Sequence, residues 1–246
     1  MEEDVKKIAK NGLLTLNDIK NACEVRFGQN GEMVELCEVS EEMRQGIDAV
    51  QKFSRIATIY GSARIPEESA IYKQVEELAY RLAKDLGYAI LTGGGGSIME
   101  AGNRGAHRAQ GRAIGATIKL PFEQHTNKYV TDVIPFYYFF TRKLVMRYSA
   151  ELAIYCPGGF GTMDELFEVI TLVQTNKIKK LPIVLFGSEF WNPLDAFIKK
   201  TLLDEYGTIS PNDRNLYIIT DDIDTVVEIA AAADIKKNID PENILS

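Results

Sequence analysis

The residues best placed to do chemistry stand in one run, Cys156-Pro157-Gly158-Gly159-Phe160-Gly161-Thr162-Met163-Asp164-Glu165. An apolar strand is expected over 152–155, and a helix should open directly behind the Pro-Gly-Gly turn, with Thr162 and Glu165 in its first turn. Free backbone N–H groups and the positive end of a helix dipole favour anions, and glycines let a ligand approach closely. Gly158, Gly159, Gly161 and Thr162 are therefore candidate phosphate-binding residues. A carboxylate beside phosphate is repelled by it, which indicates that Glu165 has its own chemical role.

A purely structural interpretation competes at the same place. Thr162 and Glu165 have the Thr-x-x-Glu spacing of a capping box, in which two side chains satisfy backbone N–H groups at a helix start. The neighbouring Asp164 and Glu168 are expected to face solvent or to complement the helix N-terminus. Spacing alone leaves the capping and catalytic interpretations open.

A second glycine run, Gly93-Gly94-Gly95-Gly96, follows a predicted strand at 88–92 and precedes a helix beginning near residue 98. With Ser97 it is a candidate phosphate cradle, although a tight turn that needs small residues is the alternative. Glu100, just behind it, is a candidate second carboxylate. The first loop reads Gly61-Ser62-Ala63-Arg64, not Gly-x-Gly-x-x-Gly, and the chain has no Gly-x-x-x-x-Gly-Lys-Ser/Thr loop. Dinucleotide oxidoreduction and P-loop hydrolysis are therefore disfavoured.

Arg142 and Lys143 stand near the start of another predicted helix, at 140–149. Cations are unfavourable at a helix N-terminus, which suggests an anionic partner, and arginine offers phosphate a bidentate fork. The alternative is a solvated basic face that includes Arg147. The aromatic run at 136–140 is expected to fill a core or a subunit interface, with one ring free to stack on a base. The two histidines lie far from any Cys, Asp or Glu cluster, so no metal is expected.

From residue 55 onward, strands and helices alternate. Strands are expected at 55–60, 88–92, 112–118, 128–134, 152–156, 183–186 and 216–220, with helices near 69–86, 98–109, 140–149, 162–175, 193–205 and 222–234. Short apolar strands between amphipathic helices predict an α/β fold, a Rossmann-like doubly wound, mostly parallel sheet with helices on both faces. Ligands bind beyond the carboxyl ends of such strands, so loops 61–64, 93–97 and 157–162 should converge on one crevice.

The N-terminal segment has a different pattern. Residues 1–53 are predicted to form a helical extension, with helices near 2–10, 15–23 and 40–52. They are not expected to form an independent domain, because they hold too few apolar residues to fold alone. We expect this extension to cover a face of the main domain or of a neighbouring subunit. Residues 54–246 are predicted to form the nucleotide-binding catalytic domain.

Composition narrows the class of protein. The chain has 246 residues, 46% hydrophobic and 26% charged, with a net charge of −7, which argues against nucleic acid as a partner. No run of 18 apolar residues and no signal-peptide core are present in the sequence, which argues against a membrane partner. The three cysteines lack metal or redox spacing and are expected to be reduced. A cytoplasmic location is the expectation.

Several of these motifs occur together in one known family. Thr92-Gly93-Gly94-Gly95 with Ile98-Met99-Glu100-Ala101, then Phe140-x-Arg142-Lys143, then Pro157-Gly158-Gly159-Phe160-Gly161-Thr162-x-x-Glu165, resemble the Lonely Guy (LOG) family. Its members are phosphoribohydrolases acting on cytokinin ribotides and AMP, long misnamed lysine decarboxylases. The resemblance covers about residues 54–205. Gly61-Ser62-Ala63-Arg64, the segment 120–124 and the N-terminal extension resemble the longer bacterial branch, which tends to form hexamers, whereas shorter members form dimers.

The resemblance implies specific roles. Arg142 and Glu165 occupy the family's catalytic positions, and Thr162 with the surrounding glycines binds phosphate; Lys143, Ser62, Arg64 and Glu100 are further candidate substrate contacts. No cofactor is expected, since nothing resembles a pyridoxal-phosphate lysine site, and a homo-oligomer, dimer or hexamer, is expected. Many relatives have Pro-Gly where this chain has Gly96-Ser97, which changes the loop's geometry. The rival interpretation is a non-catalytic binding protein, such as a carrier of a phosphorylated pterin cofactor, which has a similar fold and glycine turn.

Overall fold

The computed structural model describes residues 24–26, 33–120 and 125–233. Its centre is a seven-stranded sheet with the order β6-β5-β4-β3-β7-β8-β9, in which each pair of neighbouring strands is parallel. The strands are β3 (Ile56–Tyr60), β4 (Ala89–Thr92), β5 (Ala113–Ile118), β6 (Asp132–Phe136), β7 (Leu152–Tyr155), β8 (Ile183–Phe186) and β9 (Ile218–Thr220). The predicted Rossmann-like α/β fold is confirmed.

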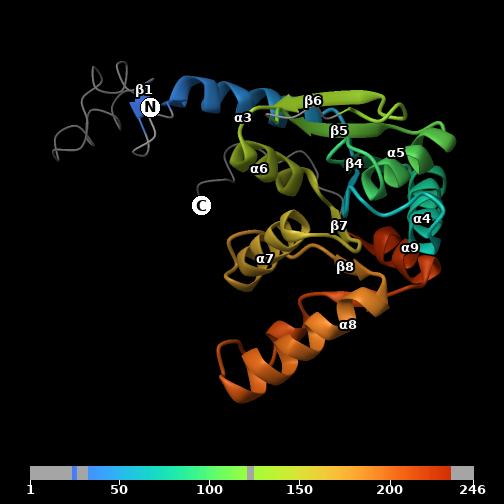
Figure 1. The fold of residues 1–246 in the computed structure, drawn as a ribbon, viewed down its shortest axis with the longest axis vertical. Helices are drawn as coiled ribbons and strands as arrows, with labels where there is room; N and C mark the ends of the chain where they lie inside the picture. Colours follow the sequence, from blue (N-terminus) through green and yellow to red (C-terminus); the bar gives the residue numbers. More distant parts are fainter. Residues whose placement is uncertain (1–23, 27–32, 121–124, 234–246) are drawn as a thin grey trace.

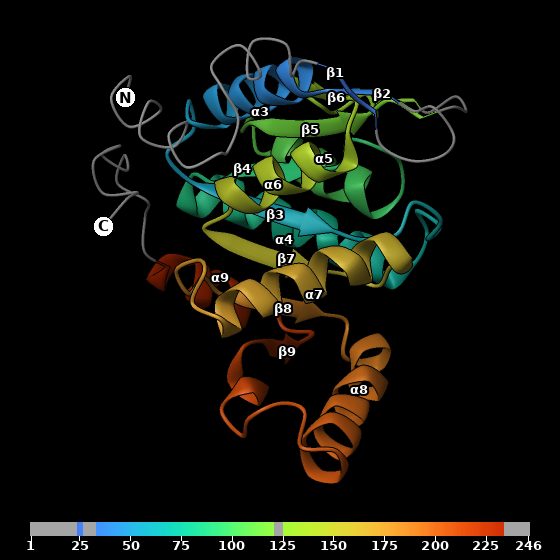
Figure 2. The same ribbon diagram turned by 90° about the vertical axis from the view of Figure 1, so that its left-hand side faces the viewer.

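Helices cover both faces of this sheet, as Figures 1 and 2 show. One face packs against α4 (Ala70–Leu86), α5 (Ile98–Arg108) and α9 (Ile223–Ala232). The other face packs against α3 (Leu36–Val50), α6 (Phe139–Ser149), α7 (Phe160–Gln174) and α8 (Ser188–Phe197). Helix α8 continues as a π-helix, η1 (Ile198–Glu205). A short 3-10 helix, η2 (Asp213–Asn215), precedes β9. Central strands such as β3 and β7 are buried along their whole length because helices lie on both sides, and this explains their continuous apolar sequences.

Local sequence signals set the helix ends that matter here. The Ser69 hydroxyl accepts a hydrogen bond from the Tyr72 amide and caps the start of α4. Gly87 ends that helix in the left-handed region, with φ of 69°, a conformation that glycine adopts readily. Chain direction then brings the carboxyl ends of β3, β4 and β7 to the same edge of the sheet.

The order of the strands reverses between β3 and β7. From β3 the chain adds β4, β5 and β6 on one side, and then returns to add β7, β8 and β9 on the other. In sheets of this kind, ligands bind at such a switch point, beyond the carboxyl ends of the two neighbouring strands. Loop 61–64 and the Pro-Gly-Gly turn begin at this point, so the fold places two of the three predicted glycine loops on either side of it.

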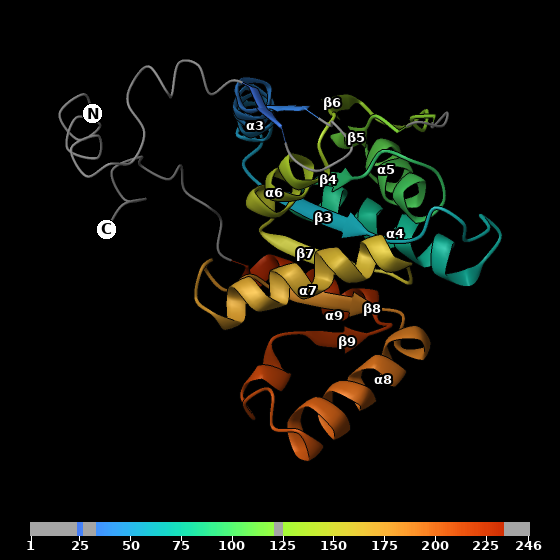
Figure 3. The same ribbon diagram turned by 60° about the vertical axis from the view of Figure 1, so that its left-hand side comes forward.

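The N-terminal region is not wholly helical. Strands β1 (Glu24–Arg26) and β2 (Met33–Glu35) form an antiparallel pair that the sequence pattern did not predict, and the helices expected near 2–10 and 15–23 lie outside the described residues. Helix α3 lies along β6 and α6 (Figure 3), and a methyl group at Gly46 would lie 2.8 Å from Val145 Cγ2. The predicted boundary near residue 53 stays a prediction.

The cysteines differ from expectation. Cys37, in α3, is disulfide-bonded, so the expectation that all three cysteines are reduced is wrong for this residue. Cys156 is free and buried at the end of β7. Across the described ranges, no helix is long and apolar enough to cross a membrane.

Candidate active site

Three loops meet at the carboxyl edge of the sheet. The Ser62 amide donates to the Pro157 carbonyl at 3.0 Å, and the Ile98 amide donates to the Ser62 carbonyl at 3.2 Å. A methyl group at Gly61 would lie 2.4 Å from Ile98 Cγ2, so only glycine allows this close approach. The predicted convergence of loops 61–64, 93–97 and 157–162 is therefore confirmed, with Ser62 as the central link.

The second glycine loop is held from below by buried amide side chains. Asn127 Nδ2 donates to the Gly95 carbonyl and to Asn103 Oδ1, both at 2.9 Å, and the Gly94 amide donates to Thr92 Oγ1 at 3.0 Å. Gly94 has φ of 75°, which favours glycine. This network fixes the loop before any ligand arrives. Sequence reasoning missed Asn103 and Asn127, which carry no motif of their own.

Ser97 ends this loop in a strained conformation. Its φ of 61° and ψ of −128° are rare for any residue other than glycine, yet its side chain is buried and its hydroxyl donates to the Ile65 carbonyl at 2.8 Å. That bond joins the second loop to the first. The hydroxyl hydrogen is thereby committed to the protein, and the phosphate-binding role of Ser97 stays a prediction.

Arg142 reaches the glycine loop from α6. Its Nε donates to the Ala116 carbonyl at 2.7 Å, and its Nη2 lies 2.3 Å from where a methyl group at Gly93 would sit. The guanidinium therefore occupies the space that a side chain at Gly93 would need. Burial lowers the pKa of Arg142, and the Glu165 carboxylate opposes that shift. Two residues predicted from separate motifs, Arg142 and Gly93, are thus in direct contact.

Glu165 does not cap its helix. Helix α7 begins at Phe160 with Gly159 as the N-cap, and no side-chain hydrogen bond caps this end within the described part of the chain. Thr162 is the third residue of the helix and Glu165 lies in its second turn, so the expectation of Glu165 in the first turn is wrong. The capping-box interpretation fails for the same reason. Glu165 is available for another role.

The environment of Glu165 favours its neutral form. Its side chain is half-buried, and this burial raises its pKa from 4.5 to about 7. Arg142 and Lys143 act in the opposite direction, whereas Asp164 and Glu168 add to the rise. A carboxyl group poised near neutrality in a crevice suits acid–base work or stabilisation of a developing cation.

The glycines of the third loop fall into two groups. A methyl group at Gly158 would lie 2.1 Å from Thr162 Oγ1, so the buried Thr162 side chain excludes any larger residue there. A methyl group added at Gly159 or at Gly161, by contrast, would meet no described atom within 4 Å. Gly158 thus serves packing within the protein, while the open positions leave space beside the helix start for a ligand.

The remaining candidates are placed as follows. Lys143 pairs with Asp164 at 2.7 Å and with Glu168 at 3.1 Å. Asp164 is exposed to solvent, as expected, and Glu168 is partly buried. Ser62 Oγ accepts from the Arg64 amide at 2.9 Å, and the Arg64 side chain is exposed at the rim. These contacts tie α6 to α7 and stiffen the first loop.

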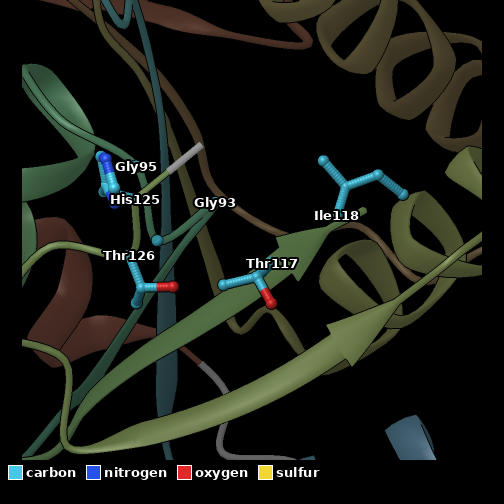
Figure 4. Close-up of a pocket in the computed structure, with 7 residues that line it drawn as sticks. Gly93, Gly95, Thr117, Ile118, His125 and Thr126 are labelled. Carbon is cyan, nitrogen blue, oxygen red and sulfur yellow. The ribbon is translucent and has the colours of Figure 1, made fainter. Parts of the chain in front are cut away.

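Glu100 lies in the first turn of α5, behind the second glycine loop. Its side chain is half-buried, and burial raises its pKa, with Glu67 adding to the rise. A small hollow also opens beside this loop (Figure 4). It is lined by residues 93–95, Thr117, Ile118, His125 and Thr126. Gly93 lines this hollow and also contacts the Arg142 guanidinium, so the hollow lies next to the buried arginine.

Glu165→Gln should stabilise the protein in a pH-dependent way. The parent carboxyl has its pKa raised from 4.5 to about 7 by burial, so folding carries a penalty once the unfolded chain ionises. The penalty is absent below pH 4.5, grows as pH rises, and is full above pH 7. Urea unfolding at pH 5 and pH 8 should show the variant gaining on the order of 1–3 kcal/mol at the higher pH only. An equal gain at both values, or a loss at pH 8, contradicts this assignment.

Comparison with known proteins adds an independent line. A family model described as "Possible lysine decarboxylase" matches residues 99–230. The cytokinin riboside 5'-monophosphate phosphoribohydrolase LOG1 of Arabidopsis thaliana is 34% identical over 179 residues, covering 68% of this chain and 78% of its own. The phosphoribohydrolase LOG of Oryza sativa subsp. japonica is 31% identical over 173 residues, covering 68% of each chain.

Solved structures agree on the fold. The molybdenum cofactor carrier protein of Chlamydomonas reinhardtii has a TM-score of 0.54 and 23% identity, over 72% of this chain and 99% of its own. At that identity the likeness shows the architecture alone. The match to the family model and the sequence identity to LOG proteins also show the family. The chain therefore belongs to the Lonely Guy (LOG) family.

Proposed function

We propose that the protein hydrolyses the N-glycosidic bond of a nucleoside 5′-monophosphate, AMP or a cytokinin riboside 5′-monophosphate, to free base and ribose 5-phosphate. One observation supports this most: a desolvated carboxylate, Glu165, interacts with a buried arginine, Arg142, that touches the second glycine loop, beyond the carboxyl end of β4. The relatives compared above are named phosphoribohydrolases, and glycoside hydrolysis uses carboxylates of this kind.

The phosphate binds at the start of α7 in this proposal. The turn from Gly158 to Thr162 offers backbone N–H groups at the positive end of the helix dipole, and the second glycine loop closes the other side. Gly159 and Gly161 leave the required space. A phosphate bound there would place the attached ribose next to the second turn of the helix, which contains Glu165. Remote binding energy then orients the reacting carbon.

The chemical step follows from the charge on the sugar. As the bond from C1′ to the base nitrogen breaks, its electrons leave with the base and positive charge develops on the ribose. Ionised Glu165 stabilises that charge, and it accepts a proton from the water whose oxygen bonds to C1′. The departing base takes up one proton from solvent and Glu165 later returns the proton that it accepted to solvent, so that one water is consumed in total. Arg142 orients the carboxylate and offers donors to the substrate.

The proposal includes assembly into a homo-oligomer. Within the aromatic run, Phe136 is buried, whereas Tyr137, Phe139 and Phe140 are 60%, 57% and 52% exposed, and Phe160 beside the glycine turn is 95% exposed. Rings exposed to this degree around a crevice suit a subunit interface. Light scattering of the purified protein measures the assembly.

Purified protein should release adenine from AMP or the matching base from isopentenyl-adenosine 5′-monophosphate, measured by chromatography together with ribose 5-phosphate. Adenosine, which lacks the phosphate, should be cleaved with kcat/KM lower by roughly 10²-fold or more, because the phosphate contacts position the ribose. Glu165→Gln should lower kcat by roughly 10²- to 10³-fold while the protein stays folded. Tight nucleotide binding without release of base would favour the non-catalytic carrier instead.

Gly161→Ala separates ligand binding from packing. The added methyl group meets no described protein atom within 4 Å, and alanine is the better helix former, so thermal stability should be unchanged or slightly higher. The methyl group would occupy the phosphate site, and KM for the nucleotide should rise by about tenfold or more. Gly158→Ala is the contrast, because its methyl group collides with Thr162 and should lower the melting temperature as well. Unchanged KM in a well-folded Gly161→Ala protein places the phosphate elsewhere.

A further inference from the structure

Two tyrosines lie side by side where the sheet reverses its strand order. Tyr60 ends β3 and Tyr155 ends β7, and the two are register partners on these neighbouring parallel strands. Their rings are stacked with centroids 4.6 Å apart and an angle of 7° between planes. Their exposed fractions are 4% and 0%. A buried aromatic pair therefore lies at the switch point of the sheet.

This tyrosine pair contacts α7, the helix that carries Glu165. The Tyr155 hydroxyl donates to the Glu165 backbone carbonyl at 3.2 Å. The Tyr60 hydroxyl interacts with that of Tyr155, and the Tyr60 phenol also interacts with the charges of Glu165 and Arg142. The stack thus contacts the backbone of Glu165 and lies within electrostatic range of Glu165 and Arg142, the two residues to which the proposed function gives the chemical step.

Other charged groups also act on Glu165. From α6 come Arg142 and Lys143, which lower its pKa, and from α7 come Asp164 and Glu168, which raise it. Removal from water is the largest cause of the raised pKa of Glu165. The strands contribute neutral phenols, whose own pKa values are raised well above the usual range by burial and then by neighbouring groups that include Glu165.

We propose that Tyr60 and Tyr155 are positioning residues of this centre, whose stacked rings form a floor that excludes water from the underside of Glu165 and fixes the helix that carries it. This inference rests on the proposed function for its catalytic consequence. The exclusion of water from the Glu165 carboxyl by the two rings can be measured in the ligand-free protein. The hydroxyl groups are secondary, because the rings provide the bulk that water would otherwise fill.

Tyr60→Val and Tyr155→Val test the floor. Valine keeps a strand-forming residue but removes the ring, so water reaches the carboxyl and its pKa should fall from about 7 toward 4.5, by about one unit or more. The ligand-free measurement is a carbon-13 NMR titration of glutamate-labelled full-length protein, with the Glu165 signal identified by its loss in Glu165→Gln. In the active protein, the acid limb of kcat/KM should move to lower pH by the same amount.

Tyr60→Phe and Tyr155→Phe keep the rings, and both measurements should stay within a few tenths of a unit of the parent. Tyr88→Val is the matched control, because Tyr88 is also buried and donates to a backbone carbonyl, that of Ala230 at 2.9 Å, but on the far face of the sheet. It should lose stability without moving the Glu165 titration.

Folded Tyr60→Val or Tyr155→Val protein with a parental Glu165 titration overturns the proposal. So does a shift in either Phe variant, a result that stays available if the Val variants do not fold. Because the titration needs no turnover, a protein that fails to cleave nucleotides but shows the shift refutes the proposed function and leaves the floor intact.

Discussion

Removal of one carboxyl group from water is the constraint on which the rest of the site depends. Glu165 is buried enough that its pKa rises to about 7, even though Arg142 and Lys143 act against the rise. Arg142 is itself buried, and its pKa is lowered. Each of these residues stabilises the charged form of the other, and neither is free to move into solvent. A substrate cation formed between phosphate and carboxylate would meet a field that needs no rearrangement.

Such a pair needs rigid support, and the backbone of the three loops supplies it. Ser62 bonds to both other loops, Asn127 holds the second glycine loop from beneath, and the Ser97 hydroxyl ties that loop to the first. These contacts explain how a segment with four consecutive glycines keeps one conformation. Glycine permits close approach of a ligand, while buried polar side chains outside the motif remove the flexibility that glycine brings.

Much of the fold could be predicted from local pattern. Continuous apolar runs marked the parallel strands, and Gly87 marked a helix end, because these signals act over a few residues. The convergence of the loops also followed, since parallel strands share one edge. The start of α7 did not follow: a Thr-x-x-Glu spacing suggested a cap, whereas Gly159 begins the helix and leaves Glu165 a turn further on. The β1–β2 pair and the role of Asn127 lay beyond reach, because both depend on partners that no periodicity reveals.

The switch point explains why these features coincide. Strands β3 and β7 are paired there up to their last residues, so Tyr60 and Tyr155 face each other as register partners. The loops that follow stay joined by the hydrogen bond from the Ser62 amide to the Pro157 carbonyl. The stacked rings lie at the carboxyl ends of the two strands, beside this junction. In the proposal above, the same topology that brings the loops together also places the rings that keep water from the carboxyl group of Glu165.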